Sequence, residues 1–187
     1  ALTAALASTS LYASNAQAQS CDPARLMIIL DQSSSMSRNS IMGDTLWTHA
    51  VNALTTVVGS FEDKLQLGLM KFPEPDECNP GAVFVTPAIN TATAITDELV
   101  TAPPTGGNYT PMYQTLNVAE GVPELNQNDV PNHVVLITDG WQWCSSEDDP
   151  ADRFKPIDEV EDLAAKGITT YVVGFGEKEQ PDGTMVE

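Results

Sequence analysis

The residues best suited to chemistry are oxygen-bearing side chains that follow apolar stretches of the chain. In the sequence DQSSS, Asp31, Ser33 and Ser35 stand at alternate positions, so their side chains can turn toward one point. Thr110 follows a glycine-rich stretch, and Asp139 follows an apolar run. A set of oxygen donors with two carboxylates and no sulfur or nitrogen suits Mg²⁺, or Mn²⁺ and Ca²⁺, better than zinc or copper. These five residues therefore predict a site for one divalent cation.

Buried strands would bring the donors together. Residues 26–30 and 134–137 are continuously apolar, which is typical of central strands buried on both faces, and a candidate ligand follows each run. Residues 65–72 and 83–85 predict two further strands with only a loop between them, which indicates an antiparallel hairpin. A last strand is expected at residues 168–175.

Helices are expected between these strands. Apolar residues recur at three- and four-residue spacing from about residue 44 to residue 61, and shorter helices are expected at residues 91–100 and 156–166. Another helix should begin at Thr110 and Pro111, with the threonine as its cap and the proline in its first turn. The alternation predicts an α/β fold, namely a doubly wound, mostly parallel central sheet with one antiparallel edge strand and helices on both faces. Ligands of such sheets bind beyond the carboxyl ends of the strands.

The three motifs together resemble those of the von Willebrand factor A domains with their metal-ion-dependent adhesion site. The family pattern is DxSxS after the first strand, a Thr before a middle helix and an Asp after the fourth strand. This chain reads ILDQSSSMS, GGNYTPMYQTL and VVLITDG at those places, in the family's order. The resemblance covers about residues 24–176. It implies a Rossmann-like fold and an A domain of the secreted bacterial type.

The resemblance also implies roles for the five residues. Ser33, Ser35 and Thr110 would bind the ion directly, whereas Asp31 and Asp139 would act mainly through water. The implied function is a non-enzymatic binding or adhesion module that captures an acidic group of a protein ligand. A structural A domain of a larger surface assembly, with an ion that only stabilises it, is an open alternative.

A Mg²⁺-dependent hydrolase is a weaker alternative. An Asp after a first parallel strand is also where such enzymes place a nucleophile. A phosphatase of that kind would have a second acidic residue where this chain has Ser33, which leaves no paired carboxylate for acid or base chemistry.

The composition of the chain limits which partners it can bind and indicates where the protein is located. The formal net charge is −18, from 26 acidic residues against 8 Lys and Arg, so nucleic acid and anionic lipid are disfavoured as partners. Residues 1–18 are uncharged and close on Ala-Gln-Ala, which is typical of the end of a secretory signal peptide, although a linker would read similarly. We expect residues 19–187 to form one exported A domain that is secreted, periplasmic or at the cell surface. No apolar run approaches the roughly 20 residues that span a bilayer, so we expect no membrane insertion by this fragment.

The end of the sequence departs from the family pattern. Family members continue past the strand expected at residues 168–175 with another helix and strand, whereas this chain has a polar tail. We therefore expect that the last helix and strand are missing and that the chain is part of a longer polypeptide.

Cysteines and tryptophans gather near the predicted metal site. Cys78 and Cys144 fall in loops expected on the metal face, and we hypothesise a disulfide between them, with unpaired thiols as the alternative. Cys21 should lie at the opposite end of the domain. Trp141 and Trp143 follow Asp139 and could either form a rim that contacts the ligand or pack under the long loop.

Overall fold

The computed structural model describes residues 22–40, 43–144, 150–175, 178–179 and 185–186. The segment predicted to end a signal peptide, residues 1–18, and Cys21 lie outside the described residues. Within the described part, no helix is both long and apolar enough to cross a membrane.

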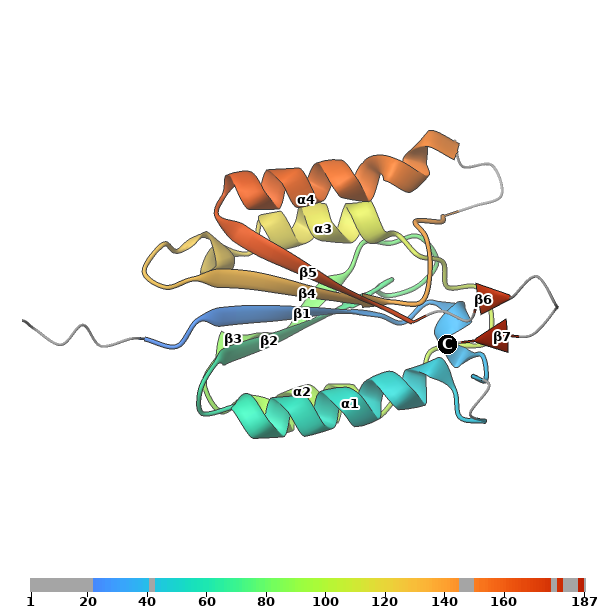
Figure 1. The fold of residues 1–187 in the computed structure, drawn as a ribbon, viewed down its shortest axis with the longest axis horizontal. Helices are drawn as coiled ribbons and strands as arrows, with labels where there is room; N and C mark the ends of the chain where they lie inside the picture. The colour runs from blue at the N-terminus through green and yellow to red at the C-terminus, as the bar shows by residue number, and fades with distance from the viewer. Residues whose placement is uncertain (1–21, 41–42, 145–149, 176–177, 180–184, 187) are drawn as a thin grey trace, which may run out of the picture.

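A five-stranded sheet forms the centre of the molecule (Figure 1). Its order is β3-β2-β1-β4-β5, and only β3 runs antiparallel to its neighbour. The strands are β1 Arg25–Asp31, β2 Gln66–Phe72, β3 Ala82–Ala88, β4 Asn132–Thr138 and β5 Ile168–Gly174. The predicted mostly parallel sheet with one antiparallel edge strand is therefore confirmed.

Helices cover both faces of this sheet, as predicted. Figure 1 shows α1 and α2 on one face and α3 and α4 on the other. Their bounds are α1 Leu46–Phe61, α2 Ala92–Glu98, α3 Met112–Glu120 and α4 Lys155–Ala165. Short 3₁₀ segments occupy Ser34–Ser37, Pro123–Asn126 and Pro150–Phe154. Each predicted helix is found within a few residues of its expected bounds.

The central strand β1 divides the core into two layers because successive side chains of a strand point to opposite faces. Ile28 and Leu30 pack toward α1 and α2, whereas Met27 and Ile29 pack toward α3 and α4. All four are 2% exposed or less, which explains why the run is apolar throughout. A β1 buried on both faces has a fixed register, and its polar end is therefore held at one place.

The carboxyl ends of the parallel strands meet at one edge of the sheet. Asp31, the last residue of β1, pairs in register with Phe72 of β2, and β4 ends beside it at Thr138. At the same end of the molecule, two-residue strands β6 Lys178–Glu179 and β7 Met185–Val186 form a small antiparallel ladder within the polar tail (Figure 1).

Candidate metal-binding site

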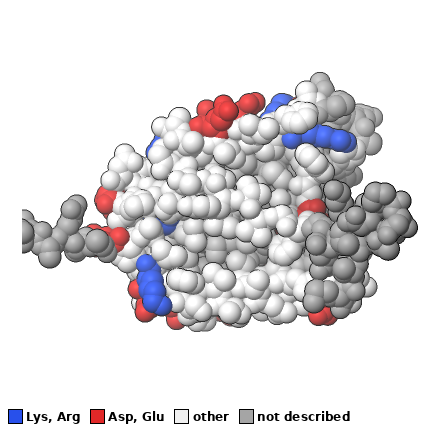
Figure 2. All heavy atoms as spheres, in the orientation of Figure 1, with Lys and Arg blue, Asp and Glu red and all other residues white. Residues whose placement is uncertain are grey.

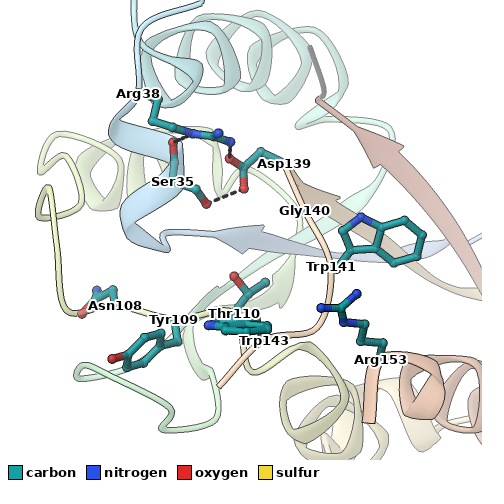
Figure 3. Close-up of a pocket in the computed structure, with 10 residues that line it drawn as sticks. All are labelled: Ser35, Arg38, Asn108, Tyr109, Thr110, Asp139, Gly140, Trp141, Trp143 and Arg153. Atoms are coloured by element: carbon teal, nitrogen blue, oxygen red, sulfur yellow. Dashed lines mark hydrogen bonds and ion pairs between the residues drawn. The ribbon is translucent and has the colours of Figure 1, made fainter. Parts of the chain in front are cut away.

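A chain of hydrogen-bonded oxygen atoms joins the two strand ends at this edge, and Figure 3 shows its link between Ser35 and Asp139. The hydroxyls of Ser33 and Ser35 lie 2.8 Å apart, and the Ser35 hydroxyl donates a hydrogen bond to Oδ1 of Asp139 at 2.7 Å. The backbone amide of Ser33 donates to Oδ1 of Asp31 at 2.7 Å. The short 3₁₀ turn after Ser33 is what brings alternate side chains of the motif to the same side. Four of the five predicted ligands are thus in one hydrogen-bonded group.

Asp31 is fully buried beneath this group. Its Oδ2 accepts a hydrogen bond of 2.6 Å from the Thr138 hydroxyl, so both of its oxygens have partners. Burial raises the pKa of Asp31 from 3.8 to about 7, against the lowering effect of the hydrogen bonds from Thr138 and Ser33. The nearby charge of Asp139 raises the pKa further. A negative charge at Asp31 is therefore costly unless a cation balances it.

The fifth predicted ligand, Thr110, is buried and reaches the same cavity from another loop. Its backbone amide donates to the Trp143 carbonyl at 2.7 Å, and the Trp143 amide donates back at 3.1 Å. The prediction that Thr110 caps α3 is wrong, because the helix begins after Pro111 and has no side-chain cap. The Thr110 backbone is held by Trp143 instead, and its side chain lines the cavity (Figure 3).

A second contact ties the Thr110 loop to the DxSxS turn. The Ser34 amide donates to the carbonyl oxygen of Asn108 at 3.0 Å, and the Asn108 amide donates to the Ser34 hydroxyl at 3.0 Å. Because Ser34 faces the neighbouring loop, Ser33 and Ser35 on either side of it are left to face each other. Ser34 therefore holds the Thr110 loop against the DxSxS turn.

A basic side chain also reaches the cluster. Arg38 donates from Nη2 to Oδ2 of Asp139 at 2.8 Å and from Nε to the Ser35 carbonyl at 3.1 Å. The Arg38 side chain is 66% exposed, whereas that of Asp139 is 1% exposed. The guanidinium thus lies over the cluster from the solvent side and can move away without disturbing the core.

An open cavity of about 480 Å³ lies over the cluster. Ser35, Thr110 and Asp139 line it. Trp141 and Trp143 also line it, with 72% and 38% of their surfaces exposed. Between them in the sequence, buried Gln142 accepts from the Tyr113 amide at the start of α3 at 2.9 Å, which fixes the loop while the two rings point outward. Contact of these rings with a ligand remains a prediction.

Comparison with known proteins identifies the family of the chain. The model of the von Willebrand factor type A domain matches residues 26–184, which is most of the chain. The chain belongs to this family. An uncharacterized protein of Bacillus subtilis, YwmC, is 27% identical over 96% of this A domain and 78% of its own length.

Solved structures share the fold. The pilus adhesin SpaC of Lactobacillus rhamnosus GG superposes with a TM-score of 0.62 and 16% identity, over 83% of this chain and 25% of the adhesin. Proximal thread matrix protein 1 of the mussel byssus, in a structure with zinc in its metal-ion-dependent adhesion site (MIDAS) motif, gives a TM-score of 0.58 and 19% identity, over 82% of this chain and 38% of that protein. Both proteins are far longer than the part that matches.

The structure brings the two cysteines of the hypothesised disulfide together without joining them, so the disulfide stays a prediction. Cys78 and Cys144 do lie in contact, as expected for two loops on the same face. The Cys78 thiol, however, donates a hydrogen bond of 2.7 Å to the carbonyl oxygen of Cys144, and no disulfide joins the two described residues. The Cys144 sulfur in turn accepts from the side-chain amide of Gln114 at 3.5 Å. The two loops are held by these hydrogen bonds and by the Thr110–Trp143 bridge.

Sequence reasoning missed three residues of the site. Thr138 contacts Asp31, Arg38 contacts Asp139, and Arg153 lines the cavity next to Trp143. Thr138 was visible as the first residue of the polar step after the fourth apolar run. The two arginines carried a signal as well, because basic residues are scarce in so acidic a chain.

The donor chemistry of the cluster fits a hard dication. Its side chains offer hydroxyl and carboxylate oxygens, and the buried carboxylate of Asp31 has a raised pKa that a nearby cation would lower. Among the described residues, no group of three or more His, Cys, Asp or Glu side chains could hold a metal ion, so the proposed site depends on its hydroxyl oxygens. The five predicted residues are thus chemically suited to Mg²⁺, Mn²⁺ or Ca²⁺.

Proposed function

We propose that this A domain is a metal-dependent binding module that holds one divalent cation and captures an acidic group of a protein ligand. The observation that carries the proposal is the contact of Ser33, Ser35 and Asp139, with oxygen–oxygen distances of 2.8 and 2.7 Å, where Ser35 and Asp139 form part of the wall of an open cavity. These are ordinary O–H···O hydrogen-bond distances, and the same oxygens are hard donors of the kind that a divalent cation binds.

In this proposal Ser33, Ser35 and Thr110 hold the ion directly, and Asp31 and Asp139 balance its charge through water. When bound, a dication supplies an exchangeable coordination position to which a carboxylate of the ligand can bind. Mg²⁺ is the expected ion, with Mn²⁺ or Ca²⁺ as substitutes, because the donors are all oxygen and only two are charged. The chain's own residues keep the site oriented, since Thr138 and the Ser33 amide fix both oxygens of Asp31.

The comparisons support this function at the level of the family. One similar structure is a pilus adhesin, and another is described with zinc in its MIDAS motif. We infer an adhesive or binding role without catalysis and a location outside the cytoplasm.

A structural role for the site is the second candidate, and one observation favours it. Arg38 already satisfies Asp139, and the serine hydroxyls satisfy each other, so the cluster can be stable as an internal network. In that case the site would only contribute to the stability of the domain within a larger assembly.

Thermal melting in EDTA, Mg²⁺, Mn²⁺ and Ca²⁺ tests for the ion. An ion at a hundred times its Kd should stabilise the wild-type domain by about 2.7 kcal/mol, or roughly 5–10 °C. Asp31→Ala and Asp139→Ala should not respond, while the exposed control Asp63→Ala should respond like wild type. A wild-type midpoint that is the same in every buffer would refute the site.

Binding of a peptide with a single Asp, N-acetyl-Gly-Asp-Gly-amide, separates the two candidate functions. The binding module requires that EDTA abolish peptide binding and that Mg²⁺ restore it. If EDTA lowers the melting temperature but the peptide binds neither with nor without Mg²⁺, the structural role is the correct one.

A further inference from the structure

Most basic side chains that the structure describes pair with carboxylates. The protein has only 8 Lys and Arg against 26 Asp and Glu. Those that form ion pairs within the described residues are Arg25, Arg38, Lys64, Lys71, Lys155 and Lys166. Arg153 is a described basic side chain with no carboxylate partner among the described residues. In a chain with such an excess of acid, an uncompensated guanidinium is a distinctive feature.

Arg153 lies at the proposed binding cavity. Its guanidinium carbon is 5.7 Å from the centre of the Trp143 ring, and both residues line the cavity with Asp139 and Thr110. Figure 3 shows the Arg153 side chain rising from the segment before α4 toward the loop that carries Trp141. Stacking on an aromatic ring limits the orientations of a guanidinium and leaves its N–H groups available.

The backbone connects this arginine to the metal-binding residues. Trp143 is bonded in both directions to Thr110, at 2.7 and 3.1 Å, so the ring under Arg153 is held at a fixed place relative to a proposed ligand of the ion. Arg38, the other arginine of the cavity, already has Asp139 as its partner. Arg153 is thus the group left to bind an anion that enters from outside.

We propose that Arg153, supported by Trp143, forms a second subsite of the cavity, and that the ligand is an acidic peptide with two carboxylates. One carboxylate would go to the cation and the other to Arg153, so the proposal rests on the proposed function. A guanidinium accepts a carboxylate in a two-point hydrogen-bonded pair. A cavity of about 480 Å³ also offers more room than a single carboxylate needs.

Long-range charge limits how acidic the ligand can be. Figure 2 shows basic side chains gathered at the end of the molecule where α4 begins, and acidic ones over the middle of the same helix. The acidic residues of α4 are Asp158, Glu159, Glu161 and Asp162. With a net charge of −18, the surface beyond the cavity repels long polyanions. A short motif with two carboxylates therefore suits the site better than a polyacidic segment.

A peptide series tests the subsite. Peptides with one Asp are compared with peptides in which two Asp residues are separated by zero to four glycines, in Mg²⁺ at fixed ionic strength, by tryptophan fluorescence. Wild-type protein should bind the best two-carboxylate peptide about tenfold more tightly than the single-carboxylate peptide. Arg153→Gln should bind both equally, and Arg153→Lys should keep part of the preference because it keeps the charge but not the planar geometry.

Lys166→Gln is the matched control, since it removes a basic side chain that pairs with Glu120 away from the cavity, and it should behave like wild type. Arg153 is exposed, so its replacement should leave the melting temperature unchanged. A wild-type protein without the preference, or an Arg153→Gln protein that retains it, overturns the second subsite. Calorimetry with Mg²⁺ distinguishes the two proposals. If Arg153→Gln binds Mg²⁺ normally and keeps the preference for two carboxylates, only the second subsite is refuted. If the wild-type protein binds no Mg²⁺, the proposed function is refuted.

Discussion

Replacing the buried carboxylate by its neutral isostere, Asp31→Asn, should stabilise the metal-free domain at neutral and alkaline pH. Asp31 is fully buried and has a pKa of about 7 in the folded chain, against 3.8 as its ordinary value. An asparagine can still accept from the Ser33 amide, and the Thr138 hydroxyl can turn to accept a hydrogen bond from it. The variant therefore removes the charge and leaves the shape.

The sign and size follow from proton linkage. Between pH 4 and pH 7 the folded metal-free protein holds a proton on Asp31 that the unfolded chain has lost, so stability falls as pH rises. The contribution is fully present below about pH 4 and lost above about pH 7. A shift of about three pKa units at about 1.4 kcal/mol each amounts to roughly 4 kcal/mol. Asp31→Asn has no such proton to lose, so at pH 8 its free energy of unfolding should exceed that of wild type by up to this amount.

Urea unfolding of both proteins in EDTA, from pH 4 to pH 8, measures the difference directly. Asp63→Asn controls for removal of an exposed carboxylate. Addition of Mg²⁺ should narrow the difference at pH 8, because only wild type gains a balancing cation. Stability curves of wild type and Asp31→Asn that stay parallel over the whole pH range in EDTA would refute the reasoning.

Three further outcomes are expected. The affinity of wild type for Mg²⁺, measured by calorimetry, should be about tenfold weaker at pH 6 than at pH 8, because a proton must leave Asp31; a pH-independent Kd would contradict this. Arg38→Gln should bind Mg²⁺ about threefold more tightly, because an exposed competing cation is lost, and an unchanged Kd would show that Arg38 does not compete. In chemical unfolding, Gly68→Ala should lower the free energy of unfolding by about 1–3 kcal/mol, because its Cβ would lie 2.8 Å from Pro87. Gly59→Ala, at an exposed position of α1, should raise the free energy of unfolding by about 0.5–1 kcal/mol. Equal effects of the two substitutions would contradict the packing of β2 against β3.

The fold was predictable because its signals are local. A continuous apolar run such as residues 26–30 indicates a strand buried on both faces, and a polar residue directly after it must lie at the sheet edge. Parallel order then brings the ends of β1 and β4 together, so Asp31 and Asp139 could be assigned to one site without any knowledge of their contacts.

The remaining details depend on contacts between distant parts of the chain. The pairing of Arg38 with Asp139 and of Thr110 with Trp143 joins loops whose relative positions no periodicity specifies. The same limit explains the error at Thr110, where a cap was predicted from neighbouring residues but a tertiary backbone bridge holds the residue instead. The cysteine loops were correctly expected to meet, but proximity does not decide whether a disulfide forms.

Calorimetric titration of Mn²⁺ and Mg²⁺ into metal-stripped protein tests the central claim most directly. The account predicts one ion per chain for wild type and a loss of affinity of at least about a hundredfold in the Ser33→Ala and Ser35→Ala double variant. Ser37→Ala is the matched control, since its hydroxyl donates only to the Ser34 carbonyl in the same turn, and it should bind like wild type. Absence of binding in wild type, or equal binding in the double variant, would contradict the account.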